Sequence, residues 1–136
     1  NDKEKKALES YGKNLGLAFQ IADDALDYFG KDKFFGKEIG KDFFEGKATL
    51  PLIIIFQKAN TEERVFLKET FKKKERNEDD FSEVLALINK YKAVKDSFKK
   101  AEYFVNIAQG ALEIFEDSKE KEILQNMTQF SLNRSF

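Results

Sequence analysis

Apolar residues recur at three- and four-residue steps along most of this 136-residue sequence. One stripe includes Leu8, Leu15 and Ala22, and a second runs from Val94 to Phe115. This spacing places apolar side chains on one face of an α-helix. The sequence has 1 Pro and 7 Gly, so few positions interrupt a helix. The pattern therefore predicts an all-α protein.

The same periodicity and the polar segments between the stripes predict where the helices lie. Thr61 and Asp80 occupy positions suited to N-caps, and Asp117 or Ser118 is expected to cap the last helix. The apolar run at 52–56 predicts a helix that is buried on all sides. A short buried strand is the local alternative, but no other segment offers it a partner. The expected helices are 2–29, 48–59, 61–73, 80–89, 92–115 and a last one containing Phe130.

Composition excludes several classes of protein. The formal net charge is −1, which argues against nucleic-acid binding because that function needs a clustered basic excess. There is no Cys, so neither disulfides nor thiol chemistry are available, and we expect a cytoplasmic protein. No apolar run approaches the ~18 residues of a transmembrane segment. The sequence begins Asn-Asp-Lys, without Met, so we expect a piece of a longer chain.

Three carboxylates lie within five residues near the end of the first helix. On a helix, Asp23, Asp24 and Asp27 project from one side, and Gln20 lies one turn before them. Like charges so close together repel each other, and a bound cation would offset this repulsion. Oxygen ligands without His or Cys suit a hard cation such as Mg²⁺. The alternative is a solvated acidic patch at a helix end.

The segment 30–47 is the longest irregular stretch, and it contains four Gly and five Lys. Loops of this length in compact domains are usually functional or disordered. This one leaves the end of the helix that carries the carboxylates. Its lysines are therefore in a position to bind an anion held by carboxylate-bound metal. A solvated loop without function is the alternative, although the Phe pairs at 34–35 and 43–44 favour a segment packed against the protein.

An ordered string of short motifs surrounds the carboxylates. Residues 16–20 read Gly-Leu-Ala-Phe-Gln, and Tyr28 follows the aspartates. Downstream, residues 36–42 read Gly-Lys-x-x-Gly-x-Asp and residues 45–53 read Glu-Gly-Lys-x-Thr-Leu-Pro-Leu-Ile. With this string the sequence resembles the C-terminal half of the trans-prenyl diphosphate synthases, over nearly the whole chain.

The resemblance implies a fold and a reaction. Family members are bundles of helices of the isoprenoid synthase type, usually homodimers, and they use Mg²⁺. They ionise an allylic diphosphate to a carbocation, which the double bond of isopentenyl diphosphate attacks before a proton is lost. Separation of diphosphate from a cation requires neutralisation of the developing negative charge, and divalent metals supply it.

The resemblance also assigns roles to residues. It implies that Asp23, Asp24 and Asp27 hold Mg²⁺ or its waters and that Gln20 lies beside the reaction centre. Two lysines of the glycine-rich segment and one arginine of the C-terminal tail complete the expected site. Lys37 would bind the allylic diphosphate, Lys47 is a further candidate for the same role, and Arg134 is a candidate to help close the site.

The sequence departs from the family pattern in what it lacks. The first aspartate-rich motif and most residues that bind isopentenyl diphosphate are missing. We therefore expect residues 1–136 to be the C-terminal part of a single helical domain, without synthase activity alone. The alternative from another class is a non-catalytic helical interaction module that pairs its acidic helix with a basic partner. A terpenoid cyclase or head-to-head condensing enzyme is a third reading, which the motifs at 36–42 and 45–53 oppose.

Overall fold

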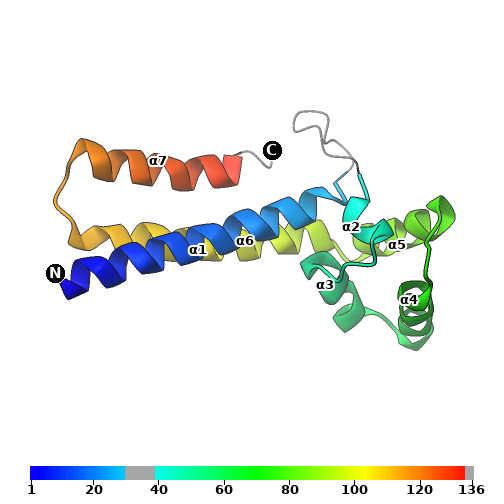
Figure 1. Cartoon of the computed structure of the whole chain (residues 1–136). Coiled ribbons are helices and arrows are strands. Elements are labelled where there is room, and N and C mark those ends of the chain that lie inside the picture. The colour runs from blue at the N-terminus through cyan, green and yellow to red at the C-terminus, as the bar shows by residue number, and fades with distance from the viewer. Residues whose placement is uncertain (30–38, 134–136) are drawn as a thin grey trace. The chain divides into compact units, whose positions relative to one another are not determined.

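The computed structural model describes residues 1–29 and 39–133, with side chains to residue 130 (Figure 1). Lys37 and Arg134 lie outside the described residues. Every regular element in the described ranges is a helix, which agrees with the predicted all-α class. No helix there is long and apolar enough to cross a membrane. The chain divides into two compact units, Asn1–Ala22 with Phe98–Phe136, and Asp23–Ser97.

Unit 1 is built from long helices packed along their apolar stripes. It contains α1 (Asp2–Leu26) as far as Ala22, α6 (Ala93–Ala111) from Phe98, the short 3-10 helix η1 (Leu112–Ile114) and α7 (Lys119–Asn133). Tyr11 and Leu15 of α1 form a buried cluster with Ala108 and Leu112. The Tyr11 hydroxyl also donates to the carbonyl oxygen of Leu124 in α7, at 2.8 Å. These contacts hold the helices of this unit together.

Unit 2 holds the short helices and the larger core. It contains α2 (Lys41–Phe44), α3 (Leu50–Lys58), α4 (Thr61–Lys72) and α5 (Glu78–Lys90), with the end of α1 and the start of α6. Phe43 is fully buried, and its ring centroid lies 5.4 Å from those of Phe71 and Phe81. Aromatic pairs at such distances are favourable beyond the area they bury. The Phe-rich composition is thus used in the core around α2.

Each predicted helix is present, although α1 and α6 end before the predicted residues 29 and 115. The short helix α2 lies within the segment 30–47, which was predicted to be irregular. Two predicted caps are also wrong. Asn60, not Thr61, caps α4 by accepting the Glu63 backbone N–H at 2.8 Å. Asn77 caps α5 with Asp80 at the third helical position, so α5 begins before the predicted residue. In both cases Asn, which is as good a cap as Ser or Asp, lies upstream of the predicted cap. Ser118 caps α7 as predicted, because its hydroxyl accepts the N–H of residue 121 at 3.1 Å.

Helix α3 differs from its prediction in burial. It is a helix and not a strand, and Ile55 is fully buried. Ile53 and Phe56, however, are 46% and 36% exposed, so the helix is not buried on all sides. The apolar run contains residues for more than one helix face, and only one face packs on the core. The other face borders a cavity described below.

Candidate functional site

Asp27, the third carboxylate of the acidic motif, is fully buried directly after α1. Its Oδ2 accepts the backbone N–H of Asp42 at 3.2 Å, and its carbonyl oxygen accepts the N–H of Gly40 at 2.9 Å. Gly40 has φ +84°, and a Cβ there would lie 2.9 Å from the Phe81 ring, so glycine suits this position. Asp27 therefore fixes the start of α2 against the end of α1.

Asp24 and Lys47 bring two distant motifs together. The Lys47 ammonium lies 3.8 Å from Oδ1 of Asp24, whose side chain is 14% exposed. The backbone N–H of Lys47 donates to the carbonyl oxygen of Asp42 at 2.9 Å. Since Asp42 is itself held by Asp27, the backbone that carries Lys47 is positioned by the same acidic motif. An anion that approached Asp24 through a bound cation would meet the Lys47 ammonium.

Asp23 lies in a different environment from its neighbours. It is exposed, Asp24 is partly buried and Asp27 is fully buried. Gln20, which is also exposed, precedes Asp23 by one turn in the continuous helix α1, but it belongs to unit 1. Within the described residues, no group of three or more His, Cys, Asp or Glu side chains has an arrangement that could hold a metal ion. The structure thus brings Asp24 and Lys47 together but does not gather three carboxylates there.

Buried polar groups surround Asp27. Asp42, Tyr28 and Thr49 are 8%, 2% and 3% exposed. Burial raises the pKa of the Tyr28 hydroxyl well above its usual value, and the charges of Asp27 and Asp42 raise it further. The Tyr28 hydroxyl therefore stays protonated and can donate.

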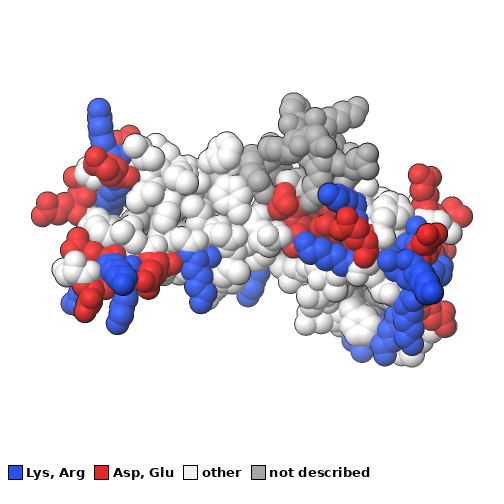
Figure 2. Space-filling view, in the orientation of Figure 1, with Lys and Arg blue, Asp and Glu red and all other residues white. Residues whose placement is uncertain are grey.

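Asp42, Tyr28 and Thr49 belong to the motif string, but sequence reasoning gave them no role. Their place in the motif string was the available signal. The contact of Asp42 with Asp27 joins residues far apart in the sequence. Figure 2 shows positive and negative side chains intermixed over this part of the chain on the face in view.

A family model, polyprenyl synthetase, matches residues 1–88. The chain belongs to the polyprenyl synthetase family. It is 33% identical over 133 residues to octaprenyl diphosphate synthase of Haemophilus influenzae, covering 98% of this chain and 40% of that protein. It is also 33% identical over 136 residues to geranylgeranyl diphosphate synthase of Saccharolobus solfataricus, covering 98% of this chain and 41% of that protein.

Solved structures of polyprenyl synthetases match the fold along the whole chain. One is polyprenyl synthase from Caulobacter crescentus CB15, complexed with calcium and isoprenyl diphosphate. Its TM-score is 0.90 at 37% identity, covering 100% of this chain and 42% of that one. Decaprenyl diphosphate synthase from Rhodobacter capsulatus gives 0.90 at 32% identity, with the same coverage. The resemblance and the helical fold predicted from sequence are therefore confirmed, and the chain spans about 40% of the length of these relatives.

Proposed function

We propose that this chain is the C-terminal catalytic part of a polyprenyl diphosphate synthase. The whole protein would condense an allylic diphosphate with isopentenyl diphosphate in Mg²⁺-dependent chain elongation. The observation that carries the proposal is the approach of the Lys47 ammonium to the Asp24 carboxylate, at 3.8 Å. It joins the acidic motif to the motif at 45–53, which contains Lys47. The named relatives in this family are synthases of prenyl diphosphates.

The donor chemistry of the first two aspartates fits Mg²⁺. Asp23 is exposed and Asp24 partly buried, so both can offer oxygens to a cation that keeps most of its waters. The bound cation would offset the negative charge that develops on the leaving diphosphate. Asp27 is assigned to the same site by the motif. Its burial and its bond to Asp42 favour a positioning role in which it holds the lysine-bearing backbone.

The chain's own cations and polar groups bind the diphosphate in this proposal. Lys47 attracts the phosphate oxygens beside Asp24. Lys37, outside the described residues, is proposed for the same task, and Gln20 for a place beside the reacting carbons. We extend the proposal to a cytoplasmic homodimer for the whole protein, which rests on the family resemblance alone. The 136 residues would form the C-terminal part of one helical domain.

The test is Asp23→Asn in the intact protein, with product formation followed at increasing Mg²⁺ concentration. We expect turnover to fall at least ~100-fold, because a neutral amide binds the cation poorly while the exposed position leaves the fold intact. Asp2→Asn is the matched control, since it makes the same change at an exposed position at the start of the same helix. Unchanged turnover in Asp23→Asn would contradict the proposal.

The second candidate function is a helical module whose acidic helix pairs with a basic partner. The absence, within residues 1–29 and 39–130, of a carboxylate group arranged for a metal favours it. It predicts that Asp23→Asn weakens capture of that partner and leaves Mg²⁺-dependent chemistry unaffected. The two functions thus give opposite results for one variant.

A further inference from the structure

Lys47 follows the short helix α2, and its backbone belongs to the turn that ends this helix. The N–H of Lys47 donates to the carbonyl oxygen of Asp42 at 2.9 Å. The N–H of Gly46 donates to that of Phe43 at the same distance. With Gly46 at φ +77°, these two bonds form a Schellman motif, in which Lys47 is the second residue beyond the cap Glu45. The motif fixes the direction in which the backbone of Lys47 leaves α2.

The guanidinium of Arg76 lies against this turn. Its Nε donates to the Phe43 carbonyl oxygen at 2.9 Å, and its Nη2 donates to that of Phe44 at 3.3 Å. Carbonyl groups at the end of a helix lack partners further along it, and basic side chains can supply them. A Cβ at Gly46 would lie 2.6 Å from Nη2, so the guanidinium and the Gly46 backbone are in close contact. Arg76 therefore contacts the residues that directly precede Lys47.

Arg76 is itself held by the end of α4. Its Nη1 donates to the carbonyl oxygen of Lys73 at 2.8 Å and to that of Thr70 at 3.4 Å. Its guanidinium carbon lies 5.7 Å from the centroid of the Phe71 ring. Because the guanidinium is planar and its donors have fixed directions, it holds the carbonyl groups of two helix ends in one geometry. The end of α2 is thus attached to the end of α4 through one side chain.

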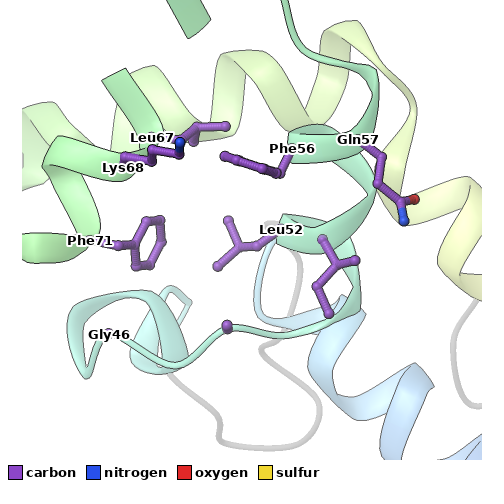
Figure 3. Close-up of a pocket in the computed structure, with 9 residues that line it drawn as sticks. Gly46, Leu52, Phe56, Gln57, Leu67, Lys68 and Phe71 are labelled. Atoms are coloured by element: carbon purple, nitrogen blue, oxygen red, sulfur yellow. The ribbon is translucent and has the colours of Figure 1, made fainter. Parts of the chain in front are cut away.

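Part of the turn borders open space. Gly46 and Ala48 line a cavity of about 430 Å³, whose other walls come from α3 and α4. Figure 3 shows Gly46 in the turn beside this space. The side chain of Lys47 is 51% exposed, so packing does not fix its ammonium. The approach of this ammonium to Asp24, at 3.8 Å, therefore depends on where the backbone of the turn is held.

We propose that Arg76 is the positioning residue for Lys47. Its guanidinium holds the end of α2 where the Lys47 ammonium lies beside Asp24 and meets the diphosphate. This inference rests on the proposed function and deepens it, because it identifies what sets the place of the diphosphate-binding lysine. Arg76 acts through the backbone and takes no part in the chemistry. It lies well beyond the motif string in the sequence, so no motif indicated it.

The experiment is a double-mutant cycle in the intact protein at saturating Mg²⁺, with geranyl diphosphate as the allylic probe. KM for this probe and kcat are measured separately. Lys47→Gln should raise KM about tenfold, since a charge-assisted contact is lost, and Arg76→Gln should raise it about fivefold. In the Lys47→Gln background, Arg76→Gln should change KM by less than about twofold. A purely structural Arg76 would instead lower kcat alone or raise KM equally in both backgrounds, and either result would overturn the proposal.

Arg64→Gln is the matched control. Arg64 donates to the carbonyl oxygens of Phe56 and Gln57 at the end of α3, both at 3.0 Å. It therefore makes the same kind of contact at a different helix end. Its replacement should destabilise the protein without changing KM, and circular dichroism checks that each variant is folded. An equal rise of KM in Arg64→Gln and Arg76→Gln would overturn the proposal.

Amide hydrogen exchange tests the positioning without turnover. The N–H of Lys47, which is bonded to Asp42, should exchange at least ~10-fold faster in Arg76→Gln and at an unchanged rate in Arg64→Gln. Gly46→Ala is a second variant, because its Cβ would displace the guanidinium or the turn. It should give the same faster exchange and the same raised KM. Unaltered exchange at Lys47 in both Arg76→Gln and Gly46→Ala would overturn the proposal.

The outcomes separate this inference from the proposed function. If Lys47→Gln raises KM and Arg76→Gln does not, only the inference fails. If Lys47→Gln leaves KM unchanged, the diphosphate-binding role of Lys47 in the proposed function fails, and this inference fails with it. Neither result bears on Asp23→Asn, which tests the cation site by itself.

Discussion

At the scale of single residues, Asp23 and Asp27 carry the same kind of side chain in different environments. Asp27 is buried and accepts a backbone N–H, whereas Asp23 is exposed. Removal of a buried acceptor leaves its donor without a partner, at a cost of about 1–3 kcal/mol. We predict that Asp27→Ala lowers the free energy of unfolding by that amount in urea denaturation without Mg²⁺. Asp23→Ala should change it by less than about 0.5 kcal/mol, and equal effects would contradict the prediction.

Glu63 connects α4 to α5 through its charge. Its carboxylate accepts from Lys90 at 2.7 Å and from the Tyr91 hydroxyl at 2.5 Å, and it also accepts the Asn60 N–H. The bonds from Lys90 and Tyr91 lower the pKa of Glu63 from 4.5 to about 2. Because the folded pKa is the lower one, this stabilisation is complete above pH 4.5 and is lost as the pH falls toward 2.

We therefore predict that Glu63→Gln lowers the melting temperature near neutral pH and has a much smaller effect near pH 2, where about half of the unchanged Glu63 is protonated in the folded protein and nearly all of it in the unfolded one. Gln keeps an oxygen for the Asn60 N–H, so the variant tests mainly the charge. Melting temperatures measured at a series of pH values check this. Glu69→Gln on α4 is the control, and its curve should run parallel to that of the unchanged protein. A Glu63→Gln curve that also ran parallel would refute the prediction.

At the scale of the elements, Arg76 holds the short helix α2 in place. Its Nε donates to the Phe43 carbonyl oxygen at 2.9 Å and its Nη2 to that of Phe44 at 3.3 Å. Its Nη1 donates to the Lys73 carbonyl oxygen at 2.8 Å. A four-residue helix gains little stability from its own hydrogen bonds. The fork of guanidinium N–H donors on Arg76 therefore supplies stability that a longer helix would gain from its own backbone.

We predict that Arg76→Lys destabilises the protein by about 1–3 kcal/mol, because an ammonium cannot reproduce the planar fork. Urea denaturation followed by circular dichroism measures the change. Lys74→Gln, two residues away and exposed, should stay within about 0.5 kcal/mol of the unchanged protein. If Arg76→Lys unfolded at the same urea concentration as the unchanged protein, the fork would have no structural importance.

The helices could be predicted from the sequence because apolar periodicity is a local property. The stripes that begin at Leu8 and Val94 gave α1 and α6 within a few residues of their observed ends. The caps at Asn60 and Asn77 were missed because adjacent residues were also acceptable caps, so local preference did not decide between them. The exposure of Ile53 on α3 depends on which face meets the core, and this is set by α4 and α5.

At the scale of the whole molecule, the candidate site was only partly predictable. The sequence identified Asp24 and Lys47 separately through their motifs, and the structure places them 3.8 Å apart. The burial of Asp27 could not be predicted, because Asp27 lies against Gly40 and Asp42, which are distant in the sequence. Helical spacing alone put Asp23 and Asp27 in one environment, whereas the end of α1 at Leu26 separates them.

The length of the chain gives the last prediction. It spans about 40% of the relatives it matches, and the family's first aspartate-rich motif is not in its sequence. We predict that the 136 residues alone form no elongated product from allylic and isopentenyl diphosphates with Mg²⁺. Radiolabelled isopentenyl diphosphate and product extraction measure this. The intact protein is the positive control, and elongation by the isolated 136 residues at a comparable rate would disprove the prediction.

The double attachment of Asp27 has a consequence for the neighbouring helices. Its carbonyl oxygen holds the backbone N–H of Gly40, and its carboxylate holds that of Asp42. One residue thereby ties the end of α1 to the start of α2, so a substitution at Asp27 would loosen both elements at once.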